Sequence, residues 1–238
     1  MARPSRPLLI TIISALWIPT VLLLDSGAGI WEQRALGVAT WALLIALLYG
    51  ETRSVRVQVG AVIIAATMLE YTASPLLGLY TYRLENVPSF VPPGHGLVYL
   101  AALTIGSAVA GTRWNRRLVY GALALAALWA LYGVTVASRS DTGGALLFLF
   151  LAAFLLRGRQ PAVYAAAFFV TAYLELLGTG IGTWAWAHKD FLGVTTLGNP
   201  PSGIAGGYGW LDMVGLYAAV WFGSLVGRAE AVPEPASA

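Results

Sequence analysis

Long apolar runs recur from one end of the chain to the other, and they limit the fold more than any other feature. A helix needs roughly 20 mostly apolar residues to cross the hydrocarbon core of a bilayer, with about 17 as a practical minimum. Runs of or near that length cover residues 8–24, 35–50, 57–73, 95–111, 118–137, 143–157, 161–178 and 209–227. We therefore predict an all-α polytopic integral membrane protein with about eight transmembrane helices. They form a single membrane domain over residues 1–238, of which residues 228–238 are a flexible C-terminal tail.

The composition excludes the other broad classes of protein. Of the 238 residues, 58% are hydrophobic and only 11% are charged, whereas a soluble domain carries about 25% charged residues. Such a chain cannot cover a water-facing surface. It has no cysteine, which excludes a disulfide framework, a thiolate metal site and a cysteine nucleophile. The basic residues form short clusters between apolar runs, a pattern that indicates membrane topology rather than nucleic-acid binding.

The distribution of basic residues predicts the orientation, because loops on the cytoplasmic side carry an excess of Lys and Arg. With eight spans both termini lie on one side. That side holds ten basic residues, Arg3, Arg6, Arg53, Arg56, Arg113, Arg116, Arg117, Arg157, Arg159 and Arg228. The other side holds four, Arg34, Arg83, Arg139 and Lys189. We predict a protein of a bacterial-type cell membrane with both termini in the cytoplasm; a seven-span alternative weakens the contrast only slightly.

Two stretches of the chain resemble each other and suggest an internal repeat. Each has a glutamate near a helix end (Glu70, Glu175), then a glycine and two aromatic residues two positions apart, then a proline pair and a glycine-flanked entry to the next helix. Two parallel four-helix repeats, residues 1–111 and 118–227, would explain the pattern, with a site at their interface. Chance similarity of aromatic, Gly-rich loops is the alternative.

The two long loops, 74–94 and 179–208, are rich in Gly, Pro and aromatic residues and poor in charge, unlike disordered linkers. On the eight-span model they lie on the non-cytoplasmic side. We interpret them as folded caps that dip toward the bilayer, where protein can bury irregular backbone. The alternative is that their aromatic residues form only the interfacial belt.

Three acidic residues lie in apolar sequence and are the candidate catalytic residues: Glu70, Glu175 and Asp212. Acids inside membrane spans mark functional sites by default because their insertion is costly. Burial favours the neutral carboxyl form, so one of them could serve as a general acid. All three fall near the non-cytoplasmic helix ends, and we expect them to share one cavity. A structural hydrogen bond to a neighbouring helix is the alternative for each.

Aromatic residues crowd the same positions and are the candidate substrate-binding residues. They are Tyr71, Tyr80, Tyr82, Trp184, Trp186, Tyr208 and Trp210. Aromatic faces stabilise cations, so a protonated carboxyl among them suits protonation of an alkene, followed by hydration, cyclisation or isomerisation. The expected partner is an apolar polyene that arrives from the membrane lipid.

His95 and Asn199 complete the candidate binding residues. His95 stands at the entry of the fourth span, and Asn199 opens a run of Pro and Gly residues, 199–209. That run could form a backbone nest for an oxyanion, although close packing at its glycines explains it equally well. Neither His95 nor His188 occurs in a metal-ligand spacing. We predict no metal and no cofactor.

The glutamates and aromatic pairs resemble the carotenoid-biosynthesis hydratase family, which includes carotenoid 1,2-hydratases and bisanhydrobacterioruberin hydratases. The matching residues are Glu70, Gly78-x-Tyr80-x-Tyr82 and Val87-Pro88, and again Glu175-Leu176-x-Gly178-Thr179 and Gly182-x-Trp184-x-Trp186. Leu77 and Ile181 replace the phenylalanine that precedes the family's glycine, and tryptophans replace both tyrosines in the second copy. The resemblance implies an isoprenoid enzyme that protonates an alkene.

Three classes of function remain open from the sequence. The first is acid–base chemistry on an isoprenoid lipid, with Glu175 and Glu70 as acid and base, as in a hydratase or a membrane terpene cyclase. The second is a proton-coupled transporter, since repeats and intramembrane acids also occur there. The third is a non-catalytic lipid-binding or assembly subunit. A retinal protein is excluded, because the single lysine, Lys189, lies in a loop.

Overall fold

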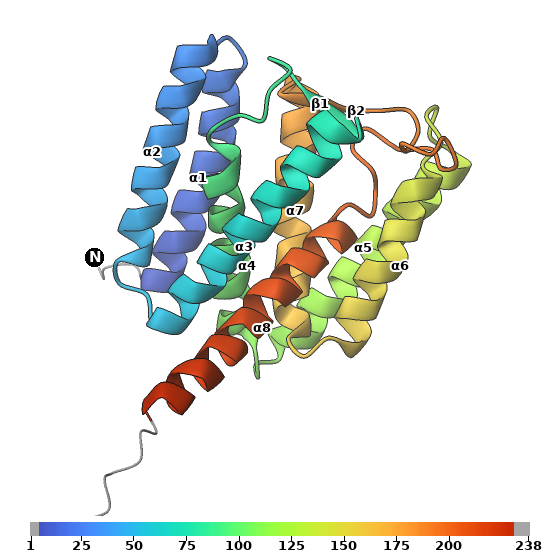
Figure 1. Ribbon diagram of the computed structural model, residues 1–238. Coiled ribbons are helices and arrows are strands. Elements are labelled where there is room, and N and C mark those ends of the chain that lie inside the picture. Colours follow the sequence, from blue (N-terminus) through green and yellow to red (C-terminus); the bar gives the residue numbers. More distant parts are fainter. Residues whose placement is uncertain (1–4, 231–238) are drawn as a thin grey trace, which may run out of the picture.

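The computed structural model describes residues 5–230, and its described part contains eight α-helices (Figure 1). They are α1 (Arg6–Asp25), α2 (Ile30–Leu48), α3 (Arg53–Tyr71), α4 (Val91–Val109), α5 (Trp114–Thr135), α6 (Thr142–Arg157), α7 (Pro161–Ile181) and α8 (Ala205–Glu230). A π-helical turn, η1 (Thr72–Leu76), extends α3, and two short strands, β1 (Tyr80–Tyr82) and β2 (Trp184–Trp186), lie in the long loops. Each helix overlaps one apolar run of the sequence.

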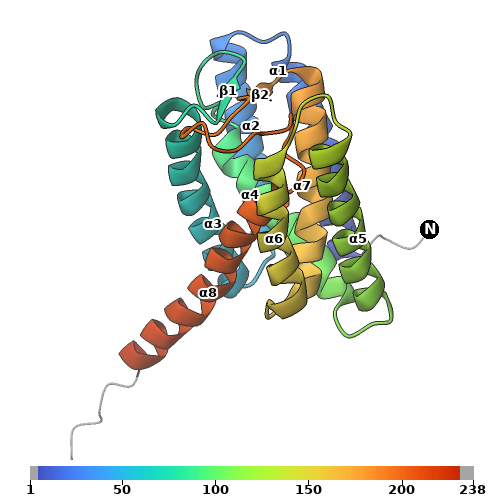
Figure 2. The ribbon, with the colours of Figure 1, turned by 90° about the vertical axis from the view of Figure 1, so that its right-hand side faces the viewer.

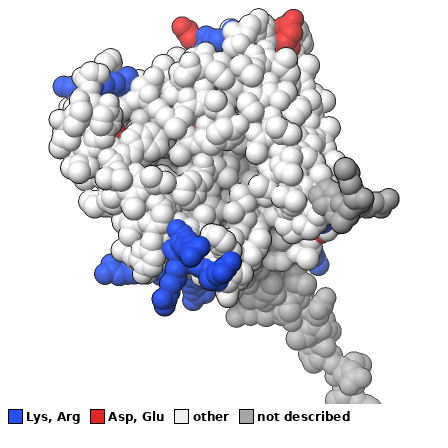
Figure 3. Space-filling view, turned by 180° about the vertical axis from the view of Figure 1, so that it is seen from behind, with Lys and Arg blue, Asp and Glu red and all other residues white. Residues whose placement is uncertain are grey.

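Four of these helical segments within residues 5–230 are long and apolar enough to cross a membrane: Arg6–Asp25, Arg53–Leu76, Trp114–Thr135 and Pro161–Ile181. The surface agrees with a membrane protein, because large apolar side chains such as Leu16, Ile64 and Leu128 are more than half exposed. In Figure 3 a wide uncharged band separates the charged residues at the two ends of the molecule. The eight-span topology itself stays a prediction.

The centre of the bundle is the pair α4 and α7, which pack along each other. Residues 95–102 of α4 and 162–168 of α7 are buried without interruption, as expected for helices that are apolar all round. The helices approach closely because Gly106 has no side chain: a Cβ there would lie 2.6 Å from the Cα of Val163. Helices α3 and α8 also pack along each other. Each of these two pairs joins a helix of the first half of the chain to a helix of the second half, so the halves form one unit.

The two long loops meet over one end of the bundle (Figure 2). Strands β1 and β2 pair antiparallel, with Tyr80 opposite Trp186 and Tyr82 opposite Trp184. Two arginines fix the loops by binding backbone carbonyls: Arg83 binds those of Asp25 and Ala28, and Arg139 those of Trp186, Ala187 and Leu197. The loops are folded, and we call the β1–β2 pair the cap.

Most helix boundaries differ by a few residues from those of the predicted runs, and two of the differences change an interpretation. Helix α4 begins at Val91, so the proline pair predicted as loop lies in its first turn, where a missing backbone N–H costs nothing. Helix α8 continues to Glu230, so residues 228–230 are helical and not part of a tail; the rest of the predicted tail lies outside the described residues.

Candidate functional site

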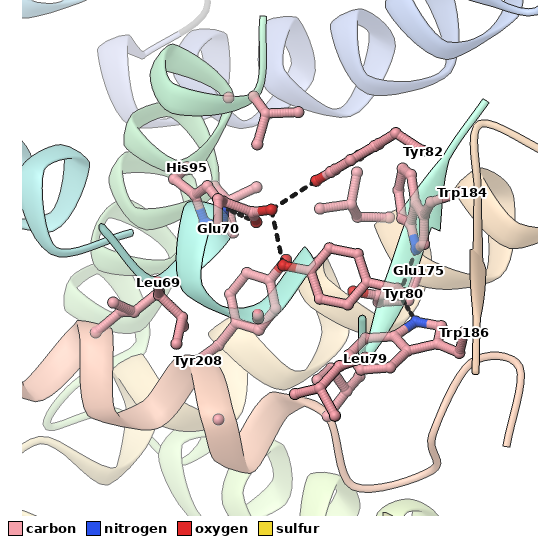
Figure 4. Close-up of a pocket in the computed structure, with 18 of the residues that line it drawn as sticks. Leu69, Glu70, Leu79, Tyr80, Tyr82, His95, Glu175, Trp184, Trp186 and Tyr208 are labelled. Carbon is pink, nitrogen blue, oxygen red and sulfur yellow. Dashed lines mark hydrogen bonds and ion pairs between the residues drawn. The ribbon is translucent and has the colours of Figure 1, made fainter. Parts of the chain in front are cut away.

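Beneath the cap lies a cavity of about 480 Å³ whose wall is mostly apolar. It is lined by residues of α1, α2, α3, α4, α6, α7, α8 and both loops. Eight of the residues singled out in the sequence line it: Glu70, Tyr80, Tyr82, His95, Glu175, Trp184, Trp186 and Tyr208 (Figure 4). The size is in the range of small-molecule sites.

Glu70, at the end of α3, is buried and accepts three hydrogen bonds. The hydroxyls of Tyr80 and Tyr82 donate to its Oε2 over 2.7 and 2.8 Å. The Nε2 of His95, on α4, lies 2.8 Å from its Oε1. Both tyrosines reach the same carboxylate because alternate residues of a strand share one face. The His95 ring stacks on Tyr208 of α8, with 5.4 Å between ring centroids.

Burial beside the Glu70 carboxylate also determines the state of the two phenols. Burial, the larger cause, and the neighbouring Glu70 carboxylate both raise the pKa of Tyr80 and of Tyr82 well above the ordinary value. The hydroxyls therefore stay protonated and act as donors.

Glu175, on α7, is held in a matching way by the second loop. The indole Nε1 atoms of Trp184 and Trp186 donate to its Oε2 over 3.0 and 3.1 Å. Within the described residues no donor binds its other oxygen, Oε1, and no cation pairs with it. Trp184 passes close over α7 at Gly178, where a Cβ would lie 1.9 Å from the indole ring. The glycine thus makes room for the ring that orients the acid.

The cap connects the two acids through ring contacts. Tyr80, which binds Glu70, lies 4.7 Å between centroids from Trp186, which binds Glu175. Tyr82 and Trp184 lie 6.0 Å apart. The strand pairing is symmetric, because the first aromatic residue of each strand faces the second of the other. Two acids from distant parts of the chain therefore meet at one cavity, each held by the aromatic pair of the loop that follows it.

Four candidates lie away from this cavity. The expectation that all three acids share it is wrong for Asp212, which is buried in α8 but does not line the wall. Tyr71 and Trp210 are 56% and 48% exposed and do not line it either; Trp210 packs on Phe154 of α6. Asn199 supports the cap from outside, since its Oδ1 accepts the backbone N–H of Trp186.

Sequence reasoning missed Asp141, which organises the second loop. This buried residue caps α6 by accepting the N–H of Gly144, and it also accepts the N–H groups of Gly198 and Ser202. Of these amides, that of Ser202 belongs to the suggested oxyanion nest, so it is occupied by the protein itself. Close packing explains the glycines of that run: a Cβ on Gly203 would lie 2.1 Å from a carbonyl oxygen of α6. The signal in the sequence was an Asp directly before a helix, a preferred N-cap.

Within residues 5–230 no group of three or more acidic or histidine side chains is placed to hold a metal ion. No protein-family model, no curated protein and no solved structure matches the chain. The function is therefore inferred from the residues of the cavity.

Proposed function

We propose that the protein is a membrane enzyme that protonates an alkene of an apolar isoprenoid lipid. One observation carries the proposal: two buried glutamates with different partners face a single apolar cavity. One has a histidine beside it and the other has only neutral indole donors. An acid and a base separated by their environments are what such chemistry requires.

Glu175 is the proton donor in this proposal. An unpaired charge in apolar surroundings is costly, and among the described residues Glu175 has neither a cationic partner nor a donor to Oε1. A proton on Oε1 would face the cavity, while the two indoles hold Oε2 and fix the direction of the carboxyl group.

Glu70 with His95 is the proton acceptor. Their contact of 2.8 Å lets a proton pass between carboxylate and imidazole, and the two tyrosine hydroxyls stabilise the carboxylate by donating to it. Charge-assisted bonds of this kind are stronger than neutral ones.

The reaction begins with transfer of the Glu175 proton to one alkene carbon. The π electrons form the new C–H bond, and the neighbouring carbon becomes cationic. Water then adds to the cation and gives a proton to Glu70–His95, which yields an alcohol; alternatively, a neighbouring C–H loses its proton to the same base, which yields an isomer or, after attack by a second alkene, a ring. In each case one proton leaves Glu175 and one arrives at Glu70–His95, and solvent exchange restores both.

The aromatic wall suits the cationic intermediate. The rings of Tyr80, Trp184, Trp186 and Tyr208 line the cavity, and a desolvated aromatic face stabilises a cation by about 2 kcal/mol or more. The carotenoid-hydratase resemblance of these same glutamates and aromatic residues supports this chemistry. The proposal includes eight spans in two parallel repeats with cytoplasmic termini. The symmetric strand pairing supports the repeat, and the excess of basic residues on one side supports the orientation.

The test is mass spectrometry of isoprenoid lipids from carotenoid- and terpenoid-producing cells that express the wild type, Glu175→Gln, Glu70→Gln or the control Glu32→Gln. Glu32 is an exposed glutamate in the first turn of α2. We expect a product in the wild type and the control that is absent in both cavity variants. A mass increase equal to water identifies hydration, and an equal mass identifies cyclisation or isomerisation. No product from any precursor pool would overturn the proposal in favour of transport or lipid binding.

A further inference from the structure

Three large apolar residues of the cavity wall are also exposed at the protein surface, and we infer that the cavity opens between them. Of its lining residues, Leu69, Leu146 and Phe191 are large apolar residues that are strongly exposed, at 46%, 51% and 56%. Leu69 belongs to α3, Leu146 to α6 and Phe191 to the second long loop. Figures 1 and 2 both show α8 beginning between α3 and α6. We call the opening bounded by these three residues the lateral mouth, since it lies on the side of the bundle.

The second long loop adds a tight apolar turn to this mouth. Besides Phe191, the side chains of Leu192 and Val194 are 70% and 77% exposed. The turn is held by Asp190, whose carboxylate accepts the N–H groups of Leu192, Val194 and Thr195 and the hydroxyl of Thr195. An ordered turn that presents three large apolar side chains is unfavourable in water and favourable in a membrane.

The mouth offers little to a charged ligand. Two charged residues of the cavity wall adjoin the mouth residues in sequence, Glu70 beside Leu69 and Asp190 beside Phe191. Both oxygens of Asp190 are occupied by its own turn. The groups that could react, Glu70 and Glu175, are by contrast only 6% and 3% exposed. A molecule that enters through the mouth therefore passes an apolar rim before it meets the acids.

We propose that the lateral mouth opens into the hydrocarbon of the bilayer, that the 191–194 turn rests in the same layer, and that an apolar lipid chain enters there from the membrane with its uncharged end first. This inference rests on the proposed function for the reaction at the inner end, but the route of entry is tested separately. A lipid with its charged headgroup at the reacting end is not a substrate on this proposal, because the three side chains that bound the mouth are apolar.

The chain has no cysteine, so single cysteines can be introduced and labelled with a nitroxide without removing native thiols. We choose Leu146→Cys and Val194→Cys, with Ser138→Cys as a control at an exposed polar position of the α5–α6 loop. In liposomes without substrate, electron paramagnetic resonance compares relaxation by oxygen, which concentrates in hydrocarbon, with relaxation by a water-soluble nickel complex. We expect oxygen to dominate at positions 146 and 194 and nickel at 138. Nickel access at 146 or 194 equal to that at 138 overturns the inference.

A second comparison uses a variant in which the mouth is narrower. Leu146→Trp places a larger ring at the rim, and Leu149→Trp is the matched control on the same helix, exposed but outside the cavity wall. We expect several-fold less product with Leu146→Trp than with Leu149→Trp, and equal yields overturn the entry route. If the labels lie in hydrocarbon but the wild type makes no product, the location of the mouth is supported and the enzymatic proposal is refuted. If product forms but the labels face water, the location of the mouth is refuted and the enzymatic proposal is supported.

Discussion

Substituting Gly178 by alanine perturbs the support of Glu175 without touching the carboxyl group. The new Cβ would lie 1.9 Å from the Trp184 ring, far inside any allowed contact, and Trp184 is only 7% exposed. The ring cannot move aside freely, so its bond to Glu175 is strained or lost. Gly180, two residues later, is the matched control, because a Cβ there meets nothing within 4 Å.

The expected magnitude follows from three contributions. Overpacking of a filled core costs about 1–3 kcal/mol, and the lost hydrogen bond about 1 kcal/mol more. The better helix propensity of alanine returns up to about 1 kcal/mol. The free energy of unfolding should therefore fall by about 1–3 kcal/mol in Gly178→Ala, while Gly180→Ala should leave it unchanged or raise it by up to about 1 kcal/mol.

Unfolding of the purified protein in mixed micelles, followed by near-ultraviolet circular dichroism, measures both variants. The tryptophan signals should also report the displaced Trp184. On the proposed function, product yield falls in Gly178→Ala although Glu175 is intact. If both alanine variants were equally stable and active, the role assigned to Gly178 and Trp184 would be refuted.

Three further predictions concern the aspartates Asp141, Asp212 and Asp190. Asp141→Ala leaves three backbone N–H groups without their acceptor. Thermal unfolding should therefore show a free energy of unfolding lower by about 1–3 kcal/mol or more, whereas the control Ser138→Ala should leave it unchanged. Asp212 has a buried oxygen without a hydrogen bond; Asp212→Asn should therefore keep or raise stability and keep product formation, and loss of product with retained stability would make it a functional residue. Hydrogen bonds from Thr195, foremost its hydroxyl, lower the pKa of Asp190 from 3.8 to about 2. Because the folded-state pKa is the lower one, the turn is stabilised above about pH 4 and loses that support as the pH falls toward 2. The temperature of thermal unfolding in detergent micelles should therefore fall more steeply with decreasing pH in the wild type than in Asp190→Asn, and equal slopes would contradict this role of Asp190.

The sequence by itself determined the elements and most of the chemistry of the site. Apolar runs long enough to cross a bilayer can hardly avoid forming helices, because lipid offers no partner for backbone N–H and C=O groups. Each of the eight apolar runs became a helix, and four helical segments of the described residues are long and apolar enough to cross a membrane. The two glutamates were conspicuous for the same reason, since a buried acid in such a run needs a partner. The aromatic residues that follow each glutamate, Tyr80 and Tyr82 or Trp184 and Trp186, proved to be those partners.

Only the tertiary structure decided which residues, near or far apart in the sequence, meet at the cavity. Successive helical residues differ by about 100° in direction, so Tyr71 is exposed although Glu70 beside it is buried. For the same reason Asp212 does not line the cavity although Leu211 beside it does. Asp141 binds amides 57 and 61 residues away, a pairing that no local pattern encodes. Helix formation depends on interactions within a few residues, whereas a site depends on the rotation and depth at which distant helices pack.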